Sequence, residues 1–171
     1  PDAIARLATA IAQRWGKLDI LVINAALLPQ LTPVKDIDQA SYNRALTVNV
    51  LATQALIAAF DPLLRTSADA RVIGMTSSVA TQPRAYWGAY ASTKAAFEVL
   101  LDCYGQETRN ISNVRVAIVN PARTRTAMRA KAYPGEDHAT VKPPEAVAER
   151  LVSLLSEPFA SGHRETFNEN W

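Results

Sequence analysis

The sequence predicts an α/β fold built around a parallel β-sheet, and three observations support this. Short continuous apolar runs alternate with longer helical patterns along the chain. The runs lack the apolar-polar alternation of a half-exposed strand, which is typical of strands buried on both faces of a parallel sheet. Each run also ends in a polar or small motif. We therefore expect one α/β domain spanning residues 1–171.

The first half of the chain predicts two helices and one strand. Residues 2–15 form a helix because their apolar side chains recur at helical spacing, and Gly16 ends it. Residues 20–23, Ile-Leu-Val-Ile, form a buried strand. The proline-bearing segment 29–33 is a loop, and a long helical stretch covers residues 38–64.

The second half repeats the alternation of strand and helix. Pro144 is expected in the first turn of the last helix, where its missing N–H costs nothing. The predicted elements are strand 72–75, a helix from Tyr90 to about Arg109, strand 114–119, an irregular segment 122–143, a helix from Pro144 ending before Pro158, and a short strand 165–167.

Composition limits the classes of partner. The 18 basic residues are scattered among 16 acidic ones for a net charge of +2, which argues against nucleic acid. The apolar runs look too short to span a membrane. The one cysteine, Cys103, cannot form an internal disulfide and is expected in the core, which suits a reducing cytoplasm. His138 and His163 lack ligand spacing, so no metal site is predicted.

Polar motifs follow three of the predicted strands. They are Asn24-Ala25-Ala26, Thr76-Ser77-Ser78 and Asn120-Pro121-Ala122. In a parallel sheet the carboxyl ends of the strands meet at one edge, where ligands bind. The sequence therefore predicts a ligand site at this edge.

Tyr90 and Lys94 lie four residues apart and hence on one face of a helix. A phenol has a pKa of about 10, and a nearby ammonium lowers it by favouring the phenolate. The pair is thus a candidate proton-transfer centre, with a hydroxyl of Ser77 or Ser78 to hold a substrate oxygen. Taken alone, the spacing also suits an ordinary helix face.

Together these motifs resemble the short-chain dehydrogenase/reductase family over nearly the whole chain. Asn24-Ala25-Ala26 is similar to the family's Asn-Ala-Gly, and Asn49 to its helix asparagine. Tyr90 and Lys94 match the catalytic pair. The family's serine stands thirteen residues before the tyrosine, which selects Ser77 over Ser78. The segment from Asn120 to Thr126 resembles the stretch that holds the nicotinamide.

The resemblance implies an NAD(P)-dependent oxidoreductase that interconverts a carbonyl and an alcohol, with Tyr90 as general acid or base. The cofactor would be NADP or NAD, the substrate a small molecule, and the assembly a homodimer or homotetramer. The implied catalytic residues are Asn49, Ser77, Tyr90 and Lys94, and the implied cofactor-binding residues are Asn24, Ala25, Tyr90, Lys94, Pro121, Thr124 and Thr126. Single residues also allow structural readings: Asn24 capping a strand end, Asn49 as a solvated helix residue, and Thr126 as an N-cap.

The chain departs from the family pattern in two ways. Ala26 and Ala122 stand where the family has glycine, and alanine suits only backbone without a positive φ. The glycine-rich turn that cradles the pyrophosphate is absent, so the resemblance implies a Rossmann-like doubly wound sheet truncated at its N-terminal side. Strand 20–23 would then be an unprotected apolar edge. We expect a piece of a longer enzyme or, alternatively, an inactive fragment acting as a dimerisation or interaction module.

The substrate would meet the segments 79–89 and 128–142. We expect Tyr86, Trp87, Met128 and Tyr133 to wall an apolar pocket, with the segment around Pro134 and Gly135 as a lid. Five basic residues near this side would either meet a phosphorylated or acyl-carrier substrate or be solvated: Arg84, Arg123, Arg125, Arg129 and Lys131.

Overall fold

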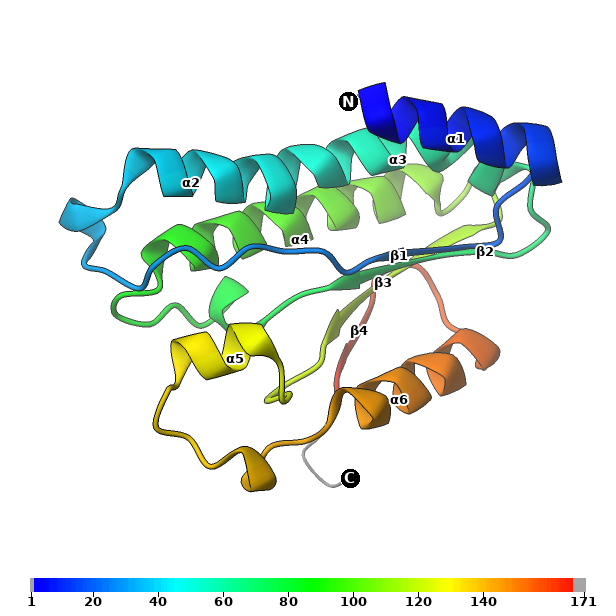
Figure 1. Cartoon of the computed structure of the whole chain (residues 1–171). Helices are drawn as coiled ribbons and strands as arrows, with labels where there is room; N and C mark the ends of the chain where they lie inside the picture. The colour runs from blue at the N-terminus through cyan, green and yellow to red at the C-terminus, as the bar shows by residue number, and fades with distance from the viewer. Residues whose placement is uncertain (1, 168–171) are drawn as a thin grey trace.

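A computed structural model of the protein describes residues 2–167 and contains a four-stranded parallel sheet (Figure 1). The strands lie in the order of the chain, and each pairs in parallel with the next. The predicted α/β class is therefore confirmed. The strands are β1 (Ile20–Ile23), β2 (Ala70–Met75), β3 (Val114–Asn120) and β4 (His163–Thr166).

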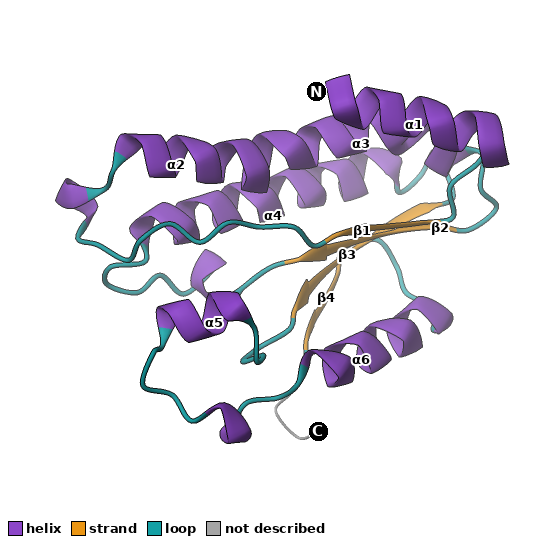
Figure 2. Cartoon of the chain, viewed as in Figure 1, coloured by secondary structure: helices purple, strands orange, loops and turns teal. Residues whose placement is uncertain are grey.

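Helices cover both faces of this sheet (Figure 2). On one face lie α1 (Asp2–Trp15), α2 (Gln39–Leu46), α3 (Ala52–Arg65) and α4 (Gly88–Thr108), and on the other lie α5 (Ala127–Ala132) and α6 (Pro144–Ser156). Because both faces are covered, the central strands bury successive side chains. Val72 and Ile73 are both fully buried although they point to opposite faces. This explains the continuous apolar runs in the sequence.

Most predicted elements are found within a few residues of their expected bounds. Pro144 opens α6 as predicted. The prediction that residues 122–143 are irregular is wrong, because α5 lies within them. Thr126 caps α5 by accepting a hydrogen bond from the Arg129 backbone N–H at 3.1 Å, and alanines favour the helical turns that follow.

The long helical stretch is interrupted by a wider π-helical turn at Thr47–Leu51 between α2 and α3. Its full extent, Gln39–Arg65, is 27 residues with mean hydropathy 1.4 over its most apolar window. The expectation that no segment is long enough to span a membrane is therefore wrong by length and composition. The observation is weak evidence for a span, since this helix contacts α1 and α4.

Cys103 is exposed on α4, contrary to the predicted place in the core. The buried side of α4 is formed by residues such as Leu101 and Tyr104, which face the sheet and α3. Cys103 instead shares the outer side of the helix with Val99, four residues earlier, which is also exposed. Apolar residues occur on both the buried and the exposed side of α4, so the sequence pattern does not distinguish the two sides.

Gly74 of β2 allows α4 to lie directly on the sheet. A Cβ atom at this position would come within 2.1 Å of Leu101 Cδ1 and 2.9 Å of Phe97 Cζ, both on α4. Any larger residue would push the helix and strand apart or force these side chains from their positions. The close approach sets the height of α4 above the strand that carries Ser77 at its end.

β1 is an edge of the described sheet and pairs only with β2 among the described strands. Ile20 and Val22 on it are 44% and 37% exposed. The expected apolar edge is therefore confirmed. Such an edge offers unpaired backbone groups and apolar side chains to any further strand.

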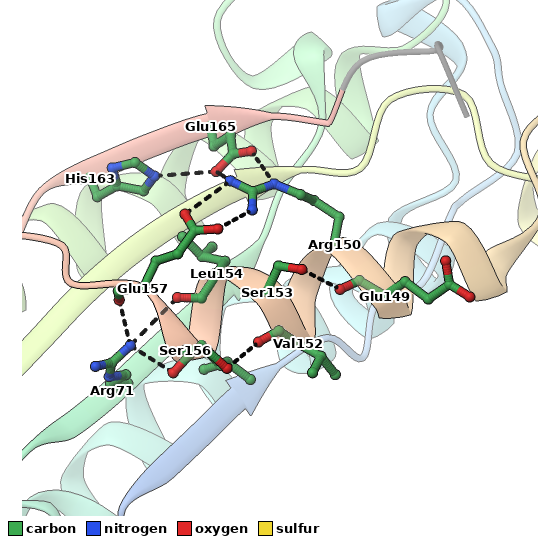
Figure 3. A network of polar contacts seen from close by, with 11 residues as sticks. Arg71, Glu149, Arg150, Val152, Ser153, Leu154, Ser156, Glu157, His163 and Glu165 are labelled. Atoms are coloured by element: carbon green, nitrogen blue, oxygen red, sulfur yellow. Dashed lines mark hydrogen bonds and ion pairs between the residues drawn. The ribbon is translucent and has the colours of Figure 1, made fainter.

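Arg71 of β2 fixes the end of α6 (Figure 3). Its Nη1 donates hydrogen bonds of 2.7 Å to the carbonyl oxygens of Leu155 and Glu157 at the helix C-terminus. A cation suits this position because the last carbonyls of a helix lack partners and carry partial negative charge. Arg150 in α6 pairs with Glu157 and with Glu165 of β4, which completes the attachment of α6 to the sheet.

We predict that Gly74→Ala lowers the free energy of unfolding by about 1–3 kcal/mol, the usual cost of overpacking a core. Gly135→Ala is the matched control, because nothing lies within 4 Å of the added methyl group and the glycine has no positive φ. It is expected to change stability by less than about 0.5 kcal/mol. Urea unfolding followed by circular dichroism measures both, and equal stability of the two variants would contradict close packing at Gly74.

Candidate active site

A cavity of about 730 Å³ lies at the carboxyl ends of β1, β2 and β3. Segments following each strand line it, together with the start of α4 and parts of α5 and α6. The structure therefore brings together most residues predicted for the site. Those that line the cavity are Asn24, Ala25, Ser77, Tyr90, Lys94, Pro121, Thr124 and Thr126.

Tyr90 and Lys94 are both buried at the base of α4, with 7% and 2% of their surface exposed. Burial raises the pKa of the Tyr90 phenol to about 12. Burial also lowers the pKa of Lys94 to about 8, opposed by the negative charge of Glu98. The predicted lowering of the Tyr90 pKa by Lys94 is wrong in this structure, because desolvation of the phenol dominates.

The Lys94 ammonium is held by two contacts, one with the end of β2 and one with α4 itself. Nζ donates a hydrogen bond of 2.7 Å to the carbonyl oxygen of Met75 and lies 4.4 Å from the centre of the Phe97 ring. Met75 is the last residue of β2, two positions before Ser77. The lysine thus links α4 to the strand end that carries the serine.

Ser77 and Ser78 occupy different environments. Ser77 has extended backbone, follows β2 and lines the cavity. Ser78 begins a short 3₁₀ turn, Ser78–Ala80, and does not line the cavity. The structure thus favours Ser77 for contact with a bound molecule, as its spacing from Tyr90 predicts.

Asn49 lies in the π-helical turn and is 1% exposed, so the alternative of a solvated helix residue is wrong. Its Oδ1 accepts a hydrogen bond from the Leu27 N–H at 2.7 Å. Its Nδ2 donates to the Leu27 carbonyl at 3.0 Å and to Thr93 Oγ1 at 2.9 Å. The side chain therefore joins the loop after β1 to α4, and neither Leu27 nor Thr93 was predicted as its partner. Single π turns often mark functional sites.

The loop after β3 places its threonines by hydrogen bonds. Thr124 Oγ1 donates to the Pro121 carbonyl at 3.2 Å, and Thr126 both lines the cavity and caps α5. The cap and cofactor readings of Thr126 are compatible. On the opposite side, Asn24 and Ala25 are exposed at the cavity rim.

A buried carboxylate beneath the site was not predicted. Glu98 of α4 accepts a hydrogen bond of 2.6 Å from Thr76 Oγ1 through its Oε1. Its Oε2 accepts one of 2.6 Å from Arg164 of β4. Thr76 stands between Met75 and Ser77, so this contact and the Lys94 contact fix the register of α4 on β2. Residues from three distant segments form the network, and no local spacing reveals it.

Ala122 has a φ of 57°, which contradicts the expectation that alanine marks backbone without positive φ. The conformation is maintained by a tight turn, in which Asn120 Oδ1 accepts a hydrogen bond from the Ala122 N–H at 3.0 Å. For a residue with a Cβ, the left-handed region of positive φ costs about 1–2 kcal/mol in free energy. Ala26 has no positive φ, so there the expectation is confirmed.

The predicted apolar wall is largely present. Trp87, Met128 and Tyr133 line the cavity, whereas Tyr86 is 59% exposed and does not. The prediction for Tyr86 is therefore wrong. It lies at a φ of 71°, in the turn just before α4. Within residues 2–167, no three His, Cys, Asp or Glu side chains come together as metal ligands would.

Comparison with known proteins identifies one family. The family model described as short chain dehydrogenase matches residues 1–137. The chain is 36% identical over 152 residues to the uncharacterized oxidoreductase YciK of Escherichia coli K12, covering 89% of this chain and 60% of YciK. It is 35% identical to the bifunctional ribulose 5-phosphate reductase/CDP-ribitol pyrophosphorylase Bcs1 of Haemophilus influenzae, covering 90% and 32%. The chain thus spans less than two thirds of each of these two relatives.

Solved structures agree with the sequence comparison. The oxidoreductase yciK from E. coli superposes with a TM-score of 0.91 at 34% identity, covering 96% of this chain and 68% of that one. A proposed short chain dehydrogenase from E. coli CFT073, complexed with NADPH, gives a TM-score of 0.91 at 34% identity, covering 96% and 69%.

The strained turn generates a prediction. Ala122→Gly relieves the backbone strain, which stabilises the folded state. Glycine also raises the conformational entropy of the unfolded chain, which costs about 0.4–1 kcal/mol of stability. We therefore expect a net gain of about 0.5–1 kcal/mol in the free energy of unfolding. Ala26→Gly, without strain to relieve, should lose about 0.4–1 kcal/mol. Thermal unfolding of both variants measures the difference, and a loss of stability in Ala122→Gly equal to that in Ala26→Gly would contradict the strain.

Proposed function

The chain belongs to the short-chain dehydrogenase/reductase family, and on that premise we propose that it serves the NAD(P)H-dependent reduction of a small-molecule carbonyl to an alcohol. The observation that carries the proposal is that the buried Tyr90 and Lys94 line one cavity together with Ser77. A phenol with a pKa of about 12 is protonated at pH 7, which is the form in which Tyr90 would act as the general acid of carbonyl reduction.

The residues present fit the nicotinamide end of the cofactor. Small side chains, Ala25, Ala26 and Ala122, line the cavity and leave room for a flat ring close to the backbone. Pro121, Thr124 and Thr126 border the same space, with Asn24 at its rim. The buried Lys94 ammonium supplies a donor for a ribose hydroxyl. Two similar solved structures, short chain dehydrogenases from Shigella flexneri 2a and E. coli CFT073, are complexed with NADP and NADPH, which supports NADP(H) as the cofactor.

The proposed mechanism gives a role to each of three side chains that line the cavity. Ser77 Oγ donates a hydrogen bond to the substrate carbonyl oxygen and stabilises the charge that develops there. Bound NAD(P)H supplies the hydride that reduces the carbonyl carbon. Tyr90 Oη gives its proton to the same oxygen, and the resulting phenolate is balanced by the Lys94 ammonium one helical turn away. Asn49 acts by holding the loop after β1 against α4.

Other properties remain predictions. A homodimer or homotetramer would use the outer sides of α4 and of the π-helical turn before α3, where Val99 and Leu51 are exposed. The cytoplasmic location, the absence of nucleic-acid and membrane partners, and the single domain over residues 1–171 likewise stay predictions; residues 1 and 168–171 lie outside the described part of the chain. No observation favours the alternative of an inactive interaction module over the enzyme.

We predict that Tyr90→Phe lowers the rate of NADPH-dependent carbonyl reduction by about 100- to 10,000-fold, because it removes the proton donor. Tyr86→Phe removes the same hydroxyl from an exposed tyrosine outside the cavity and should retain the wild-type rate. Loss of NADPH absorbance measures turnover in both variants. Turnover that survives Tyr90→Phe would refute the assignment.

Replacing each serine in turn tests which one holds the substrate oxygen. Ser77→Ala should lower kcat by about 100- to 1,000-fold, since one donor to the developing oxyanion is lost. Ser78→Ala leaves the cavity unchanged and should alter kcat by less than about threefold. A larger loss of kcat in Ser78→Ala than in Ser77→Ala would assign the contact with the substrate oxygen to Ser78.

A further inference from the structure

The substrate side of the cavity has an aromatic wall that begins at the proton donor. The Trp87 ring lies 6.0 Å from the Tyr90 ring and 5.8 Å from the Tyr133 ring, centre to centre. Leu28 and Met128 belong to the same apolar cluster. A carbonyl held at Tyr90 would therefore have its substituent against rings and apolar side chains. This arrangement suits a flat or compact apolar group.

The basic residues near this side lie mostly outside the cavity. Of the five considered for anion binding, Arg129 alone lines the cavity. Its guanidinium donates to both carboxylate oxygens of Glu136, Nη2 to Oε1 at 2.6 Å and Nε to Oε2 at 2.7 Å. It also lies 3.9 Å from the centre of the Tyr133 ring. A bidentate pair of this kind uses the geometry by which arginine would grip a substrate carboxylate.

Two further cations are held by neutral partners. Lys131 Nζ donates to the Leu28 carbonyl at 3.3 Å, and Arg84 Nη1 lies 3.4 Å from the Tyr133 hydroxyl. Neither side chain lines the cavity. Among the described lining residues only Lys94 and Arg129 carry charge, and Lys94 lies at the Tyr90 end. An anion placed beside Arg129 would also face the negative charge of Glu136, against which the positive charge of Arg123 acts from nearby.

We infer that the substrate is an uncharged ketone or aldehyde with an aromatic or alicyclic group, which packs against Trp87 and Tyr133, and that the Arg129–Glu136 pair excludes carboxylate- and phosphate-bearing substrates. The inference rests on the proposed function for the position of the carbonyl. Under this inference Glu136 determines specificity, because its carboxylate pairs with the Arg129 guanidinium and repels a second anion.

The test compares two probes of the same shape, acetophenone and 4-acetylbenzoate, which differ by one carboxylate. Isothermal titration calorimetry measures their binding to the purified protein with and without NADPH. We expect acetophenone to bind at least tenfold more tightly than 4-acetylbenzoate. Equal or tighter binding of the acid, or no binding of acetophenone, would overturn the inference. The comparison needs no variant and so does not depend on the folding of one.

A variant identifies the residue responsible. Glu136→Gln keeps the size of the side chain but frees the Arg129 charge, so 4-acetylbenzoate should gain at least tenfold in affinity while acetophenone changes by less than threefold. Glu157→Gln, which removes a carboxylate paired with Arg150 outside the cavity, is the control and should leave both affinities unchanged. An unchanged affinity of the acid in Glu136→Gln would contradict the role of the pair.

A separate titration of the protein with NADPH, followed by NADPH fluorescence, distinguishes failure of the proposed function from failure of the substrate inference. Loss of NADPH binding together with selective binding of acetophenone would refute the proposed function while leaving the apolar, uncharged character of the pocket intact. Binding of NADPH together with tighter binding of 4-acetylbenzoate would refute the substrate inference and leave the proposed function intact.

Discussion

The packing of α4 on β2 determines the rest of the site. Gly74 lets the helix lie against the strand, because any Cβ there would meet Leu101 and Phe97. Two polar contacts then fix how far the helix is shifted along the strand: Lys94 to the Met75 carbonyl and Thr76 to Glu98. Since Ser77 follows Met75 and Thr76 directly, the same contacts set its distance from Tyr90. The arrangement of the candidate active site is thus a consequence of core packing.

Burial and charge act on the pKa of Tyr90, the proposed proton donor, in opposite directions. A cation lowers the pKa of a phenol, but withdrawal from water raises it. In this structure withdrawal from water prevails, and the pKa of Tyr90 rises to about 12 while that of Lys94 falls to about 8. Glu98 partly offsets the effect on Lys94 and is itself balanced by Arg164. A neutral phenol beside a charged ammonium is the starting state that the proposed mechanism requires.

The sequence predicted what depends on local pattern and chain order. Apolar runs located the strands, and the Tyr90–Lys94 spacing located the buried pair for which we propose proton transfer. Contacts between distant segments could not be read in this way. Glu98 meets Arg164 across 66 positions, and the π turn that buries Asn49 departs from helical spacing without a sequence signal. Ala122 misled the prediction because surrounding hydrogen bonds impose a positive φ that the residue itself disfavours.

The most direct test is the titration of Tyr90, which needs no knowledge of the substrate. Carbon-13 NMR of labelled tyrosine, with Tyr90→Phe to assign the signal, measures its pKa in the free protein and with saturating NADP⁺. The account predicts a pKa of about 12 in the free protein. It further predicts a lower value with the positively charged nicotinamide bound, because a cation favours the phenolate. An ordinary value of about 10 that NADP⁺ does not move would contradict both the buried donor and its place beside the cofactor.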